Sequence, residues 1–453
     1  MNTRVILVRH GESTFNVERR VQGHCDQSFL TERGQADARR VGQSLVGIPF
    51  NAAYCSPLQR AQQTARLILE TAQPNQELSL RLSDNLKEIN LSEWEGMLFQ
   101  EIQDRFPDLY EIWRDHPHDL QMTRDTPEGK ETFYPVRSLF EQAQQFWDET
   151  LPNHLSETIL VVAHSGINRA LIGAALGMDS HHYRQMDQSN CGINVLNFPA
   201  GSSEPAQLES LNLTAHLGQK VPKPRAGQSG IRMLLVRHGE TQWNREKRFQ
   251  GQIDVPLNET GHRQAAEVAQ YLNDVPIHRA VTSPMLRPKQ TAEAIVALHP
   301  GVELENHDGL KEINHGLWEG KLEAEIEAEY GAELKQWQRS PETVQMPEGE
   351  NLQQVWERSA ATWDEIVRST AIADNLAEGM VTTVVVVAHD AVNKAILCHI
   401  MGWGPEYFWR FKQGNGAVSV IDYPHGADGD AILRASNITT GDSVLDQTAA
   451  GAL

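Results

Sequence analysis

The sequence predicts an α/β protein made of two tandem copies of one domain, each with a largely parallel sheet. Two observations support this fold class. Short β-branched runs such as RVILVRH and TILVVAH alternate with segments that have apolar residues at helical spacing. In addition, blocks of the first half recur in the second half in the same order. Duplication also suits a chain of 453 residues, which is long for a single hydrophobic core.

The duplication is clearest in one strand-ending motif. LVRHGESTFN, residues 7–16, recurs as LVRHGETQWN, residues 235–244, so that His10 and His238 stand 228 positions apart (238 − 10). Four further pairs of blocks keep the same order: 21–45 with 249–272, 55–68 with 282–295, 86–96 with 310–320, and 159–172 with 384–397. This many matches in one order indicate that a whole domain is duplicated.

Three apolar runs are predicted to be strands buried on both faces. RVILVRH ends at His10 and TILVVAH ends at His164, and both are short and β-branched. VTTVVVVA, which precedes His389, has the same character and is far shorter than a membrane span. Each run leads into polar residues, so we expect these side chains at the carboxyl edge of a parallel sheet, where α/β proteins place their sites.

The helices are predicted from their start signals. Thr31 and Asn258 stand where helix N-caps are expected. The segment after Thr31 has apolar residues at helical spacing, at Ala38, Val41 and Leu45. Helices that alternate with strands in this way predict a layered α/β structure in each half.

We predict domains over residues 1–216 and 231–441, with a linker over 217–230 and a flexible tail over 442–453. The linker contains GQKVPKPRAGQSG, whose Pro, Gly, Lys and Ser residues do not readily extend a helix or a sheet. The tail is assigned because chain ends that are not tied down are usually loose.

Composition narrows the function classes. The 40% of hydrophobic residues suffice for packed cores, and the formal net charge of −20 argues against nucleic acids and anionic membranes, which basic patches bind. The N-terminal stretch has too short an apolar run for a secretory signal, so we expect a cytoplasmic protein. Four cysteines stand far apart without a CxxC pair, which suggests neither zinc nor a disulfide framework: Cys25, Cys55, Cys191 and Cys398.

Polar residues that recur at strand ends are the candidate functional residues. They are Arg9 with Arg237, His10 with His238, Glu88 with Glu312, and His164 with His389. A single Arg-His-Gly could be a strand end whose His bonds a backbone carbonyl. Recurrence of the same polar set weakens that structural explanation, because a core requires mainly volume whereas a site requires fixed chemistry.

These residue types suggest phosphoryl chemistry. A neutral imidazole can attack phosphorus and form a covalent phosphoenzyme if nearby cations stabilise the transferring oxygens. A carboxylic acid such as Glu88 or Glu312 could then protonate the leaving alkoxide and activate water, without a metal or cofactor. Alone, each Glu could equally be an exposed strand-end carboxylate. Four arginines, otherwise ordinary surface charges, suit phosphate oxygens: Arg9 and Arg60, with Arg237 and Arg287.

With these residues in place, the chain resembles the histidine phosphatase superfamily, the phosphoglycerate-mutase-like or RHG proteins, in both halves. The resemblance implies a three-layer α/β/α sandwich with a mostly parallel sheet in each domain. It implies that His10 and His238 are phosphorylated on nitrogen and that Glu88 and Glu312 are the proton donors. It also implies that the other motif residues bind the phosphoryl group: Arg9, Asn16, Arg60, His164, Arg237, Asn244, Arg287 and His389.

The superfamily contains mutases and phosphatases, and the spacing here favours hydrolysis. Glycolytic-type mutases have a longer insertion with paired arginines between the acid and the second His. Here that spacing is 76 residues in the first half (164 − 88) and 77 in the second (389 − 312), without an Arg-Arg pair. The expected ligand is a small phosphorylated metabolite. A phosphoglycerate-type mutase and a non-catalytic phospho-ligand sensor are the alternatives.

A closer likeness suggests the substrate class. YPVRSLFEQAQQFW (134–147) and QMDQSNCGINVLNF (185–198) resemble tandem members of the superfamily that act on 2-carboxyarabinitol 1-phosphate. That resemblance implies hydrolysis of small sugar phosphates or phospho-acids.

The two halves also differ. Ser165-Gly166 follows the second His of the first half, whereas Asp390-Ala391 follows it in the second, and an inward Asp390 would oppose a phosphate. The stretch 100–137, which we expect to cover the substrate, has five Arg or Lys, and its counterpart in the second half has three. We therefore expect the first site to prefer the more anionic substrate.

Overall fold

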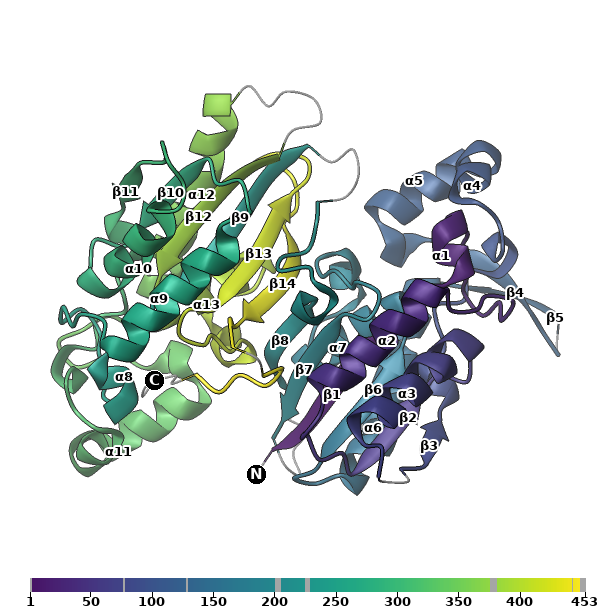
Figure 1. The fold of residues 1–453 in the computed structure, drawn as a ribbon, viewed down its shortest axis with the longest axis horizontal. Helices are drawn as coiled ribbons and strands as arrows, with labels where there is room; N and C mark the ends of the chain where they lie inside the picture. The colour runs from purple at the N-terminus through teal and green to yellow at the C-terminus, as the bar shows by residue number, and fades with distance from the viewer. Residues whose placement is uncertain are drawn as a thin grey trace. The chain divides into compact units, whose positions relative to one another are not determined.

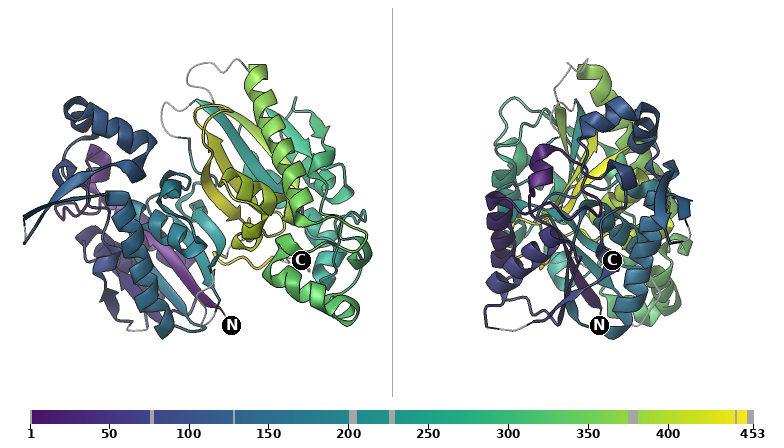
Figure 2. Two further views of the ribbon diagram at one scale, coloured as in Figure 1. Left: turned by 180° about the vertical axis from the view of Figure 1, so that it is seen from behind. Right: turned by 90° about the vertical axis from the view of Figure 1, so that its right-hand side faces the viewer.

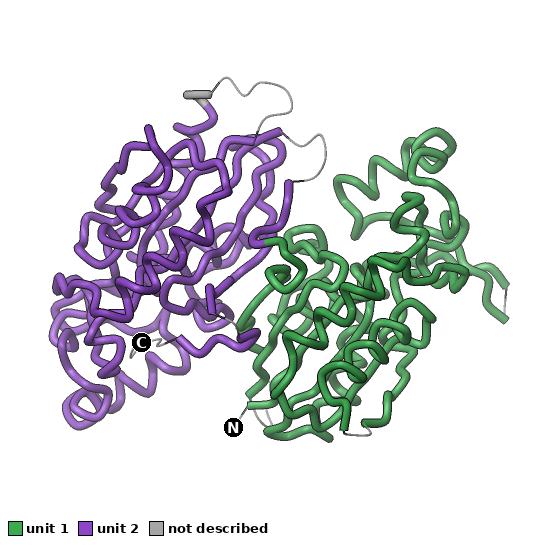
Figure 3. The backbone as a smooth tube through the Cα atoms, in the orientation of Figure 1, with its two compact units in different colours: residues 1–219 green, residues 220–453 purple. Residues whose placement is uncertain are grey.

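The computed structural model describes residues 2–75, 78–127, 129–199, 205–224, 229–374, 381–441 and 443–448. The chain divides into two compact units, Met1–Gln219 and Lys220–Leu453, which are coloured separately in Figure 3. The division falls inside the segment predicted to be the linker. The finer domain boundaries stay a prediction.

The first unit contains a mostly parallel sheet in the strand order β8-β7-β1-β6-β2-β3. β1, β6, β2 and β3 are parallel, whereas β7 is antiparallel to β1 and β8 is antiparallel to β7. The strands are β1 (Thr3–Arg9), β2 (Ala52–Cys55), β3 (Leu80–Leu82), β6 (Thr158–Ala163), β7 (Ile193–Phe198) and β8 (Gln207–Leu213).

Helices cover both faces of this sheet (Figures 1 and 2). α2 (Glu32–Ser44) packs against α3 (Gln59–Ala72), and α6 (Pro135–Thr150) packs against α7 (Ser165–Leu176). The unit is therefore the three-layer sandwich that was predicted. Between β3 and α6 lies an excursion made of α4 (Phe99–Arg105), α5 (Pro107–Asp115) and the antiparallel pair β4 (Met122–Thr126) and β5 (Gly129–Phe133).

Short helical elements complete the first unit. They are α1 (Thr14–Glu18) and the 3-10 turns η1 (Asp84–Leu86), η2 (Ser92–Trp94), η3 (Pro117–Asp119), η4 (Leu151–Asn153), η5 (Ser180–Arg184) and η6 (Ala215–Leu217).

The second unit repeats this plan with the strand order β11-β10-β12-β9-β13-β14. β9, β12, β10 and β11 are parallel, and β13 and β14 are antiparallel to their neighbours. The strands are β9 (Gly230–Arg237), β10 (Arg279–Thr282), β11 (Leu304–Asn306), β12 (Val381–Ala388), β13 (Val418–Tyr423) and β14 (Ile432–Ile438).

The helices of the second unit pair in the same way, α9 with α10 and α12 with α13. They are α8 (Gln242–Glu246), α9 (Glu259–Leu272), α10 (Leu286–Val296), α11 (Glu323–Arg339), α12 (Leu352–Asp374) and α13 (Asp390–Ile400). The 3-10 turns are η7 (Asp308–Leu310), η8 (Gly316–Trp318), η9 (Pro341–Thr343) and η10 (Pro405–Arg410).

Central strands form each core. In β1 the four side chains 5–8 are fully buried, and 384–387 of β12 are equally inaccessible. Burying a side chain of this size contributes roughly 1.5–3 kcal/mol, so these runs stabilise the sheet on both of its faces. None of the helices in the described ranges is both long and apolar enough to cross a membrane.

The predicted helix caps also fix the loop after each strand-ending His. Thr31 accepts a hydrogen bond from Gly34 N at 3.0 Å, and Asn258 accepts one from Gly261 N at 2.8 Å, so both predicted N-caps are confirmed. A Cβ at Gly34 would lie 2.1 Å from the carbonyl oxygen of Glu12. Glycine is therefore required where the helix begins against the loop that carries the motif.

The described residues of the predicted tail lie against the second unit. Thr448 Oγ1 accepts a hydrogen bond from Asn415 N at 3.1 Å, and Asn437 Nδ2 donates to Asp446 Oδ2 at 3.1 Å. The sequence predicts a loose segment here, because chain ends that are not tied down are usually loose. Residues 442 and 449–453 of the predicted tail lie outside the described ranges. Side-chain contacts between the other tail residues and distant parts of the chain cannot be read from local sequence patterns.

Candidate active site

Each unit brings two histidines together at the carboxyl edge of its sheet. Arg9 ends β1 beside Ala163 of the parallel strand β6, and His10 and His164 follow. The two imidazole ring centroids are 5.1 Å apart. In the second unit the rings of His238 and His389 are 5.2 Å apart, so the predicted recurrence of the pair extends to its geometry.

His10 is held as a neutral ring with a defined tautomer. Its Nδ1 lies 2.7 Å from the carbonyl oxygen of Gly11, so Nδ1 carries the proton and Nε2 keeps its lone pair. Thr64 accepts a hydrogen bond from Gly11 N at 3.0 Å, which fixes that carbonyl. Burial lowers the pKa of His10 well below the ordinary imidazole value, and the charges of Arg60 and Arg9 lower it further.

In the second unit, a guanidinium group faces the corresponding lone pair, on Nε2 of His238. His238 Nδ1 lies 2.7 Å from the carbonyl oxygen of Gly239, and Nε of Arg287 donates to His238 Nε2 at 3.2 Å. Burial, followed by the charge of Arg287, holds the pKa of His238 well below its ordinary value. A neutral nucleophilic nitrogen beside a guanidinium is suited to attack on a phosphate.

Arg60 is fully buried and is oriented by backbone carbonyls. Its terminal nitrogens donate to the oxygens of Gly23 at 2.9 Å and Cys25 at 3.0 Å. Gly23 has a φ of +48°, and a Cβ there would collide with Glu95, so glycine is needed in this turn. Nε of Arg60 is buried without a hydrogen-bond partner in the described part of the chain, which leaves a donor at the site.

Arg9 and His164 present further donors. Arg9 Nη1 donates to the carbonyl oxygen of Gln188 at 2.6 Å, while its Nε is buried without a partner among the described residues. His164 Nε2 is 2.7 Å from Ser56 Oγ, and its Nδ1 is likewise buried and unpartnered within the described ranges. In the second unit His389 Nε2 is 2.9 Å from the hydroxyl of Ser283. Burial lowers the pKa of Arg9 to about 10 and that of His164 well below its ordinary value.

Glu88 lies at the N-terminus of α7, the helix that begins directly after His164. Its carboxylate accepts hydrogen bonds from Gly166 N and Ile167 N, both at 3.0 Å. These two backbone amides fix the orientation of the carboxyl group at the start of α7. The structure therefore places the predicted acid at the start of the helix that follows His164, where its charge also interacts with Arg9 and Arg60.

Glu312 is held more weakly in the second unit. Ala391 N is 3.4 Å from Glu312 Oε2, and Ile313 N donates to the other oxygen at 3.0 Å. Burial raises the pKa of Glu312, and the negative charge of Asp390 adds to this rise. Glu312 thus holds a proton more readily than an exposed glutamate does.

Asn16 and Asn244, the remaining predicted residues, are linked to the backbone of the motif histidines through Asn190 and Asn415. Asn16 Oδ1 accepts from Ser13 N at 3.1 Å and caps α1. Asn190 Nδ2 donates to the same oxygen at 3.2 Å and to the carbonyl oxygen of His10 at 3.0 Å. The second unit repeats the cap with Asn244 and Thr241. Both asparagines lie at the sites, and their contact with a phosphoryl group stays a prediction.

A buried ion pair distinguishes the second site. Asp390 Oδ1 is 3.2 Å from Arg237 Nη1, and Asp390 Oδ2 is 2.6 Å from Lys394 Nζ. Ser165 stands at the corresponding position of the first unit. Asp390 does point inward, toward a cation expected to bind phosphate.

Three of the five cations in the covering stretch of the first unit are paired with carboxylates. Arg114 pairs with Asp115 at 2.7 Å. The pairs Arg124–Glu131 and Arg137–Asp119 are 3.0 and 2.7 Å apart; Arg114 and Arg137 are exposed and Arg124 is half-buried. A preference for anionic substrates therefore needs a basis deeper in the site.

Several residues that hold the site were not among the predicted ones. They recur in both halves: Ser56 and Ser283, Thr64 and Thr291, Gln188 and Gln413, and Asn190 and Asn415. Their signal is present in the sequence, because each pair keeps its residue type close to a recurring block. Small polar residues are easy to overlook, since they act by orienting other groups.

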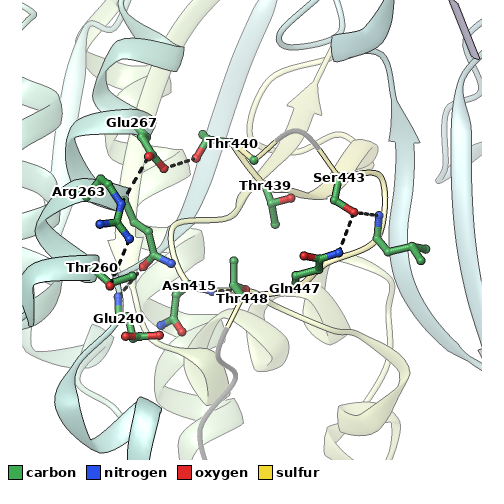
Figure 4. Close-up of a pocket in the computed structure, with 13 residues that line it drawn as sticks. Glu240, Thr260, Arg263, Glu267, Asn415, Thr439, Thr440, Ser443, Gln447 and Thr448 are labelled. Atoms are coloured by element: carbon green, nitrogen blue, oxygen red, sulfur yellow. Dashed lines mark hydrogen bonds and ion pairs between the residues drawn. The ribbon is translucent and has the colours of Figure 1, made fainter. Parts of the chain in front are cut away.

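A polar cavity of about 470 Å³ lies behind the second site (Figure 4). Asn415 lines it, together with Glu240, Arg263 and the tail residues Gln447 and Thr448. Asn415 Nδ2 also donates to the carbonyl oxygen of His238 at 3.2 Å. The tail is thus connected through Asn415 to the backbone of His238.

Comparisons with known proteins agree with this geometry. The family model of the histidine phosphatase superfamily (branch 1) matches residues 5–212 and 233–435. The chain is 31% identical to a 2-carboxy-D-arabinitol-1-phosphatase of Triticum aestivum over 441 residues, 96% of this chain and 86% of that protein. It is 32% identical to phosphoserine phosphatase 1 of Hydrogenobacter thermophilus over 209 residues, 46% of this chain and 93% of that protein.

One solved structure similar to part of the chain is the phosphoserine phosphatase of Entamoeba histolytica in complex with 3-phosphoglyceric acid. It is 27% identical, with a TM-score of 0.39, and the match covers 48% of this chain and 99% of that one.

Proposed function

The chain belongs to the histidine phosphatase superfamily, and we propose that each of its two units hydrolyses small phosphate esters through its own phosphohistidine, without a metal or cofactor. One observation carries the proposal for both units. The Nδ1 of each motif His is bonded to the next carbonyl oxygen, at 2.7 Å in each case, which leaves Nε2 as a nucleophile among buried arginines.

In the first unit, His10 Nε2 attacks phosphorus as the bond from phosphorus to the ester oxygen breaks. Glu88 gives its proton to the departing alkoxide, so the alcohol leaves neutral. Nitrogen-bound phosphate remains on His10. Nε of Arg9, Nε of Arg60 and Nδ1 of His164, buried donors with no partner in the described residues, stabilise its oxygens.

Hydrolysis reverses these roles. The Glu88 carboxylate takes a proton from water as the water oxygen attacks phosphorus and the N–P bond breaks. His10 regains its lone pair and inorganic phosphate is released. The second unit follows the same course with His238 and Glu312.

Small sugar phosphates and phospho-acids are the proposed substrates. The wheat relative is a 2-carboxy-D-arabinitol-1-phosphatase and similar to nearly the whole chain, so 2-carboxyarabinitol 1-phosphate is the first candidate. The four cysteines are free thiols in the structure, which fits the reducing cytoplasm, and cell fractionation checks that location.

Phosphate release in the presence of chelator tests the function, with 2-carboxyarabinitol 1-phosphate, 3-phosphoglycerate, phosphoserine and a chromogenic ester. His10→Ala and His238→Ala should each retain one activity, and the double variant should have none. Alkaline quenching followed by mass spectrometry should find phosphate on the peptides of His10 and His238. Full turnover by the double variant would sink the mechanism, and transfer of phosphate to an added alcohol instead of water would indicate a mutase.

A further inference from the structure

Resting on this proposed function, we propose that the two sites differ in their leaving groups. Tyr183 and Arg169 of the first unit recognise a carboxylate on the alcohol part of the ester. The second unit instead takes esters of uncharged alcohols. Differences buried inside the two sites support this division.

In the first unit the hydroxyl of Tyr183 lies next to the proton donor. A Cβ at Gly166 would lie 2.5 Å from Glu88 Oε1 and 2.7 Å from Tyr183 Oη. Both oxygens therefore approach the same glycine at the start of α7. Because Glu88 protonates the leaving oxygen, the Tyr183 hydroxyl lies on the leaving-group side of the site.

In the second unit two matched substitutions remove this hydroxyl. Gly166 corresponds to Ala391 and Tyr183 corresponds to Phe408, at the same offset of 225 residues that relates the second histidines (389 − 164). Ala391 and Phe408 are both fully buried. The methyl group of Ala391 occupies the space that the Tyr183 hydroxyl occupies in the first unit. Glycine therefore occurs together with tyrosine in the first unit, and alanine together with phenylalanine in the second.

Arg169 supplies a cation beside Tyr183. Its guanidinium carbon lies 5.5 Å from the centroid of the Tyr183 ring. Arg169 Nη2 is 3.4 Å from Asp187 Oδ1, while Nε is buried without a partner in the described part of the chain. The Tyr183 hydroxyl and the Arg169 guanidinium therefore lie together, and a carboxylate can accept hydrogen bonds from both.

Lys394, the counterpart of Arg169, has a closer and more deeply buried carboxylate partner than Arg169 has. Its Nζ is 2.6 Å from Asp390 Oδ2 and lies within 5 Å of the ring centroids of Phe408 and Trp409 (4.9 and 4.8 Å). Lys412, which replaces Asp187, pairs with the tail residue Asp446 at 3.7 Å. A carboxylate on the leaving group would meet an aromatic ring and the charge of Asp390. The second site thus rejects what the first site binds.

A pair of esters tests this inference: 3-phosphoglycerate and glycerol 3-phosphate, which differ in a carboxylate against a hydroxymethyl group. We measure kcat/KM for both in full-length His238→Ala, where only the first unit acts, and His10→Ala, where only the second acts. The ratio of phosphoglycerate to glycerol phosphate should exceed about 10 in His238→Ala and fall below 1 in His10→Ala.

Residue swaps then assign the preference. In His238→Ala, Tyr183→Phe and Arg169→Met should each move the ratio toward 1, and Arg169→Lys should keep part of it. In His10→Ala, the triple change Phe408→Tyr, Ala391→Gly and Asp390→Ser should raise it. Turnover of glycerol 3-phosphate confirms that each variant has a folded, working site.

The outcomes separate this inference from the proposed function. Equal ratios in the two single-unit variants, or a ratio that Tyr183→Phe and Arg169→Met both leave unchanged, overturn the division of substrates. Absence of phosphate release from every ester by both variants would instead contradict the phosphatase function itself.

Discussion

Arg237 and Asp390 lie 3.2 Å apart, between Nη1 and Oδ1, and both side chains are almost completely buried. The phosphoryl group expected at Arg237 must therefore compete with a carboxylate of the protein. The first unit has Ser165 in place of this carboxylate, so the competition is specific to the second unit.

Asp390→Ser in the His10→Ala background should strengthen phosphate binding and weaken the fold. Without Asp390, the cations Arg237 and Lys394 stay buried without their carboxylate, which should lower the free energy of unfolding by roughly 3–5 kcal/mol. Inorganic phosphate then supplies the missing charge and should bind about tenfold more tightly. Calorimetric titration and thermal unfolding with and without phosphate measure both effects.

The reverse change is the matched control for this prediction. Ser165→Asp in the His238→Ala background should weaken phosphate binding by the first unit. If neither change alters phosphate affinity, Asp390 does not compete with the ligand.

The pH dependence of the second unit should reflect Glu312. Burial raises its pKa above the ordinary Glu value of 4.5, Asp390 adds to the rise, and Arg287 and Arg237 oppose it. Because Glu312 must be protonated for phosphoryl transfer, kcat/KM of His10→Ala should fall only as the pH rises through this raised pKa. The acid limb should lie well below pH 6.5, because the pKa of His238 is strongly lowered.

Asp390→Ser should move the alkaline limb to lower pH, since it removes a negative charge that favours the protonated acid. Profiles of kcat/KM against pH, corrected for ionisation of the ester, measure this shift. A limb that does not move would mean that another group controls the proton transfer.

The strands and their polar ends could be predicted from the sequence because they depend on local patterns that recur. A run such as VILV predicts a buried strand from its own residues. His10 and His238 can be identified because the motif that contains them occurs twice. The sequence alone does not predict whether the Asp390 side chain points into the site. Its partner Lys394 is one turn further along α13, but Arg237 ends strand β9, which is far away in the sequence. Pairings of this kind depend on tertiary packing.

The contact between the tail and the second unit could not be predicted from local sequence patterns either. It gives Gly414 a role that can be tested. A Cβ at Gly414 would lie 2.3 Å from Thr448 Oγ1 and 2.6 Å from Asp446 Oδ2, so only glycine lets the tail approach (Figure 4 shows Thr448 beside Asn415). The first unit has Ser189 at this position. Gly414→Ser should displace the tail and loosen Asn415.

We expect Gly414→Ser to lower kcat of His10→Ala about 3- to 10-fold, because a displaced catalytic backbone loses alignment with the substrate. The same substitution in His238→Ala should leave the first unit's rate unaltered. Truncation after residue 442 should reproduce the loss. A truncated second unit with full activity would show that the tail does not hold the site.

The hydroxyl of Ser56 should determine which nitrogen of His164 donates to the phosphoryl group. Ser56 Oγ is 2.7 Å from His164 Nε2 and accepts from Leu58 N at 3.3 Å, so its own proton can point to the ring. Burial lowers the pKa of His164, so the ring is neutral and carries one proton. If the Ser56 hydroxyl donates a hydrogen bond to Nε2, this ring proton is on Nδ1, the buried donor.

Ser56→Ala removes that hydroxyl, so Nε2 can carry the ring proton and Nδ1 can turn a lone pair toward the phosphate oxygens. We expect kcat/KM of His238→Ala to fall by about 10- to 100-fold, the cost of losing one aligned donor. Ser56→Thr keeps a hydroxyl and should retain most of the activity, and Ser283→Ala should act in the same way on His10→Ala. Equal losses in Ser56→Thr and Ser56→Ala would indicate that packing around Ser56, and not its hydrogen bond, positions His164.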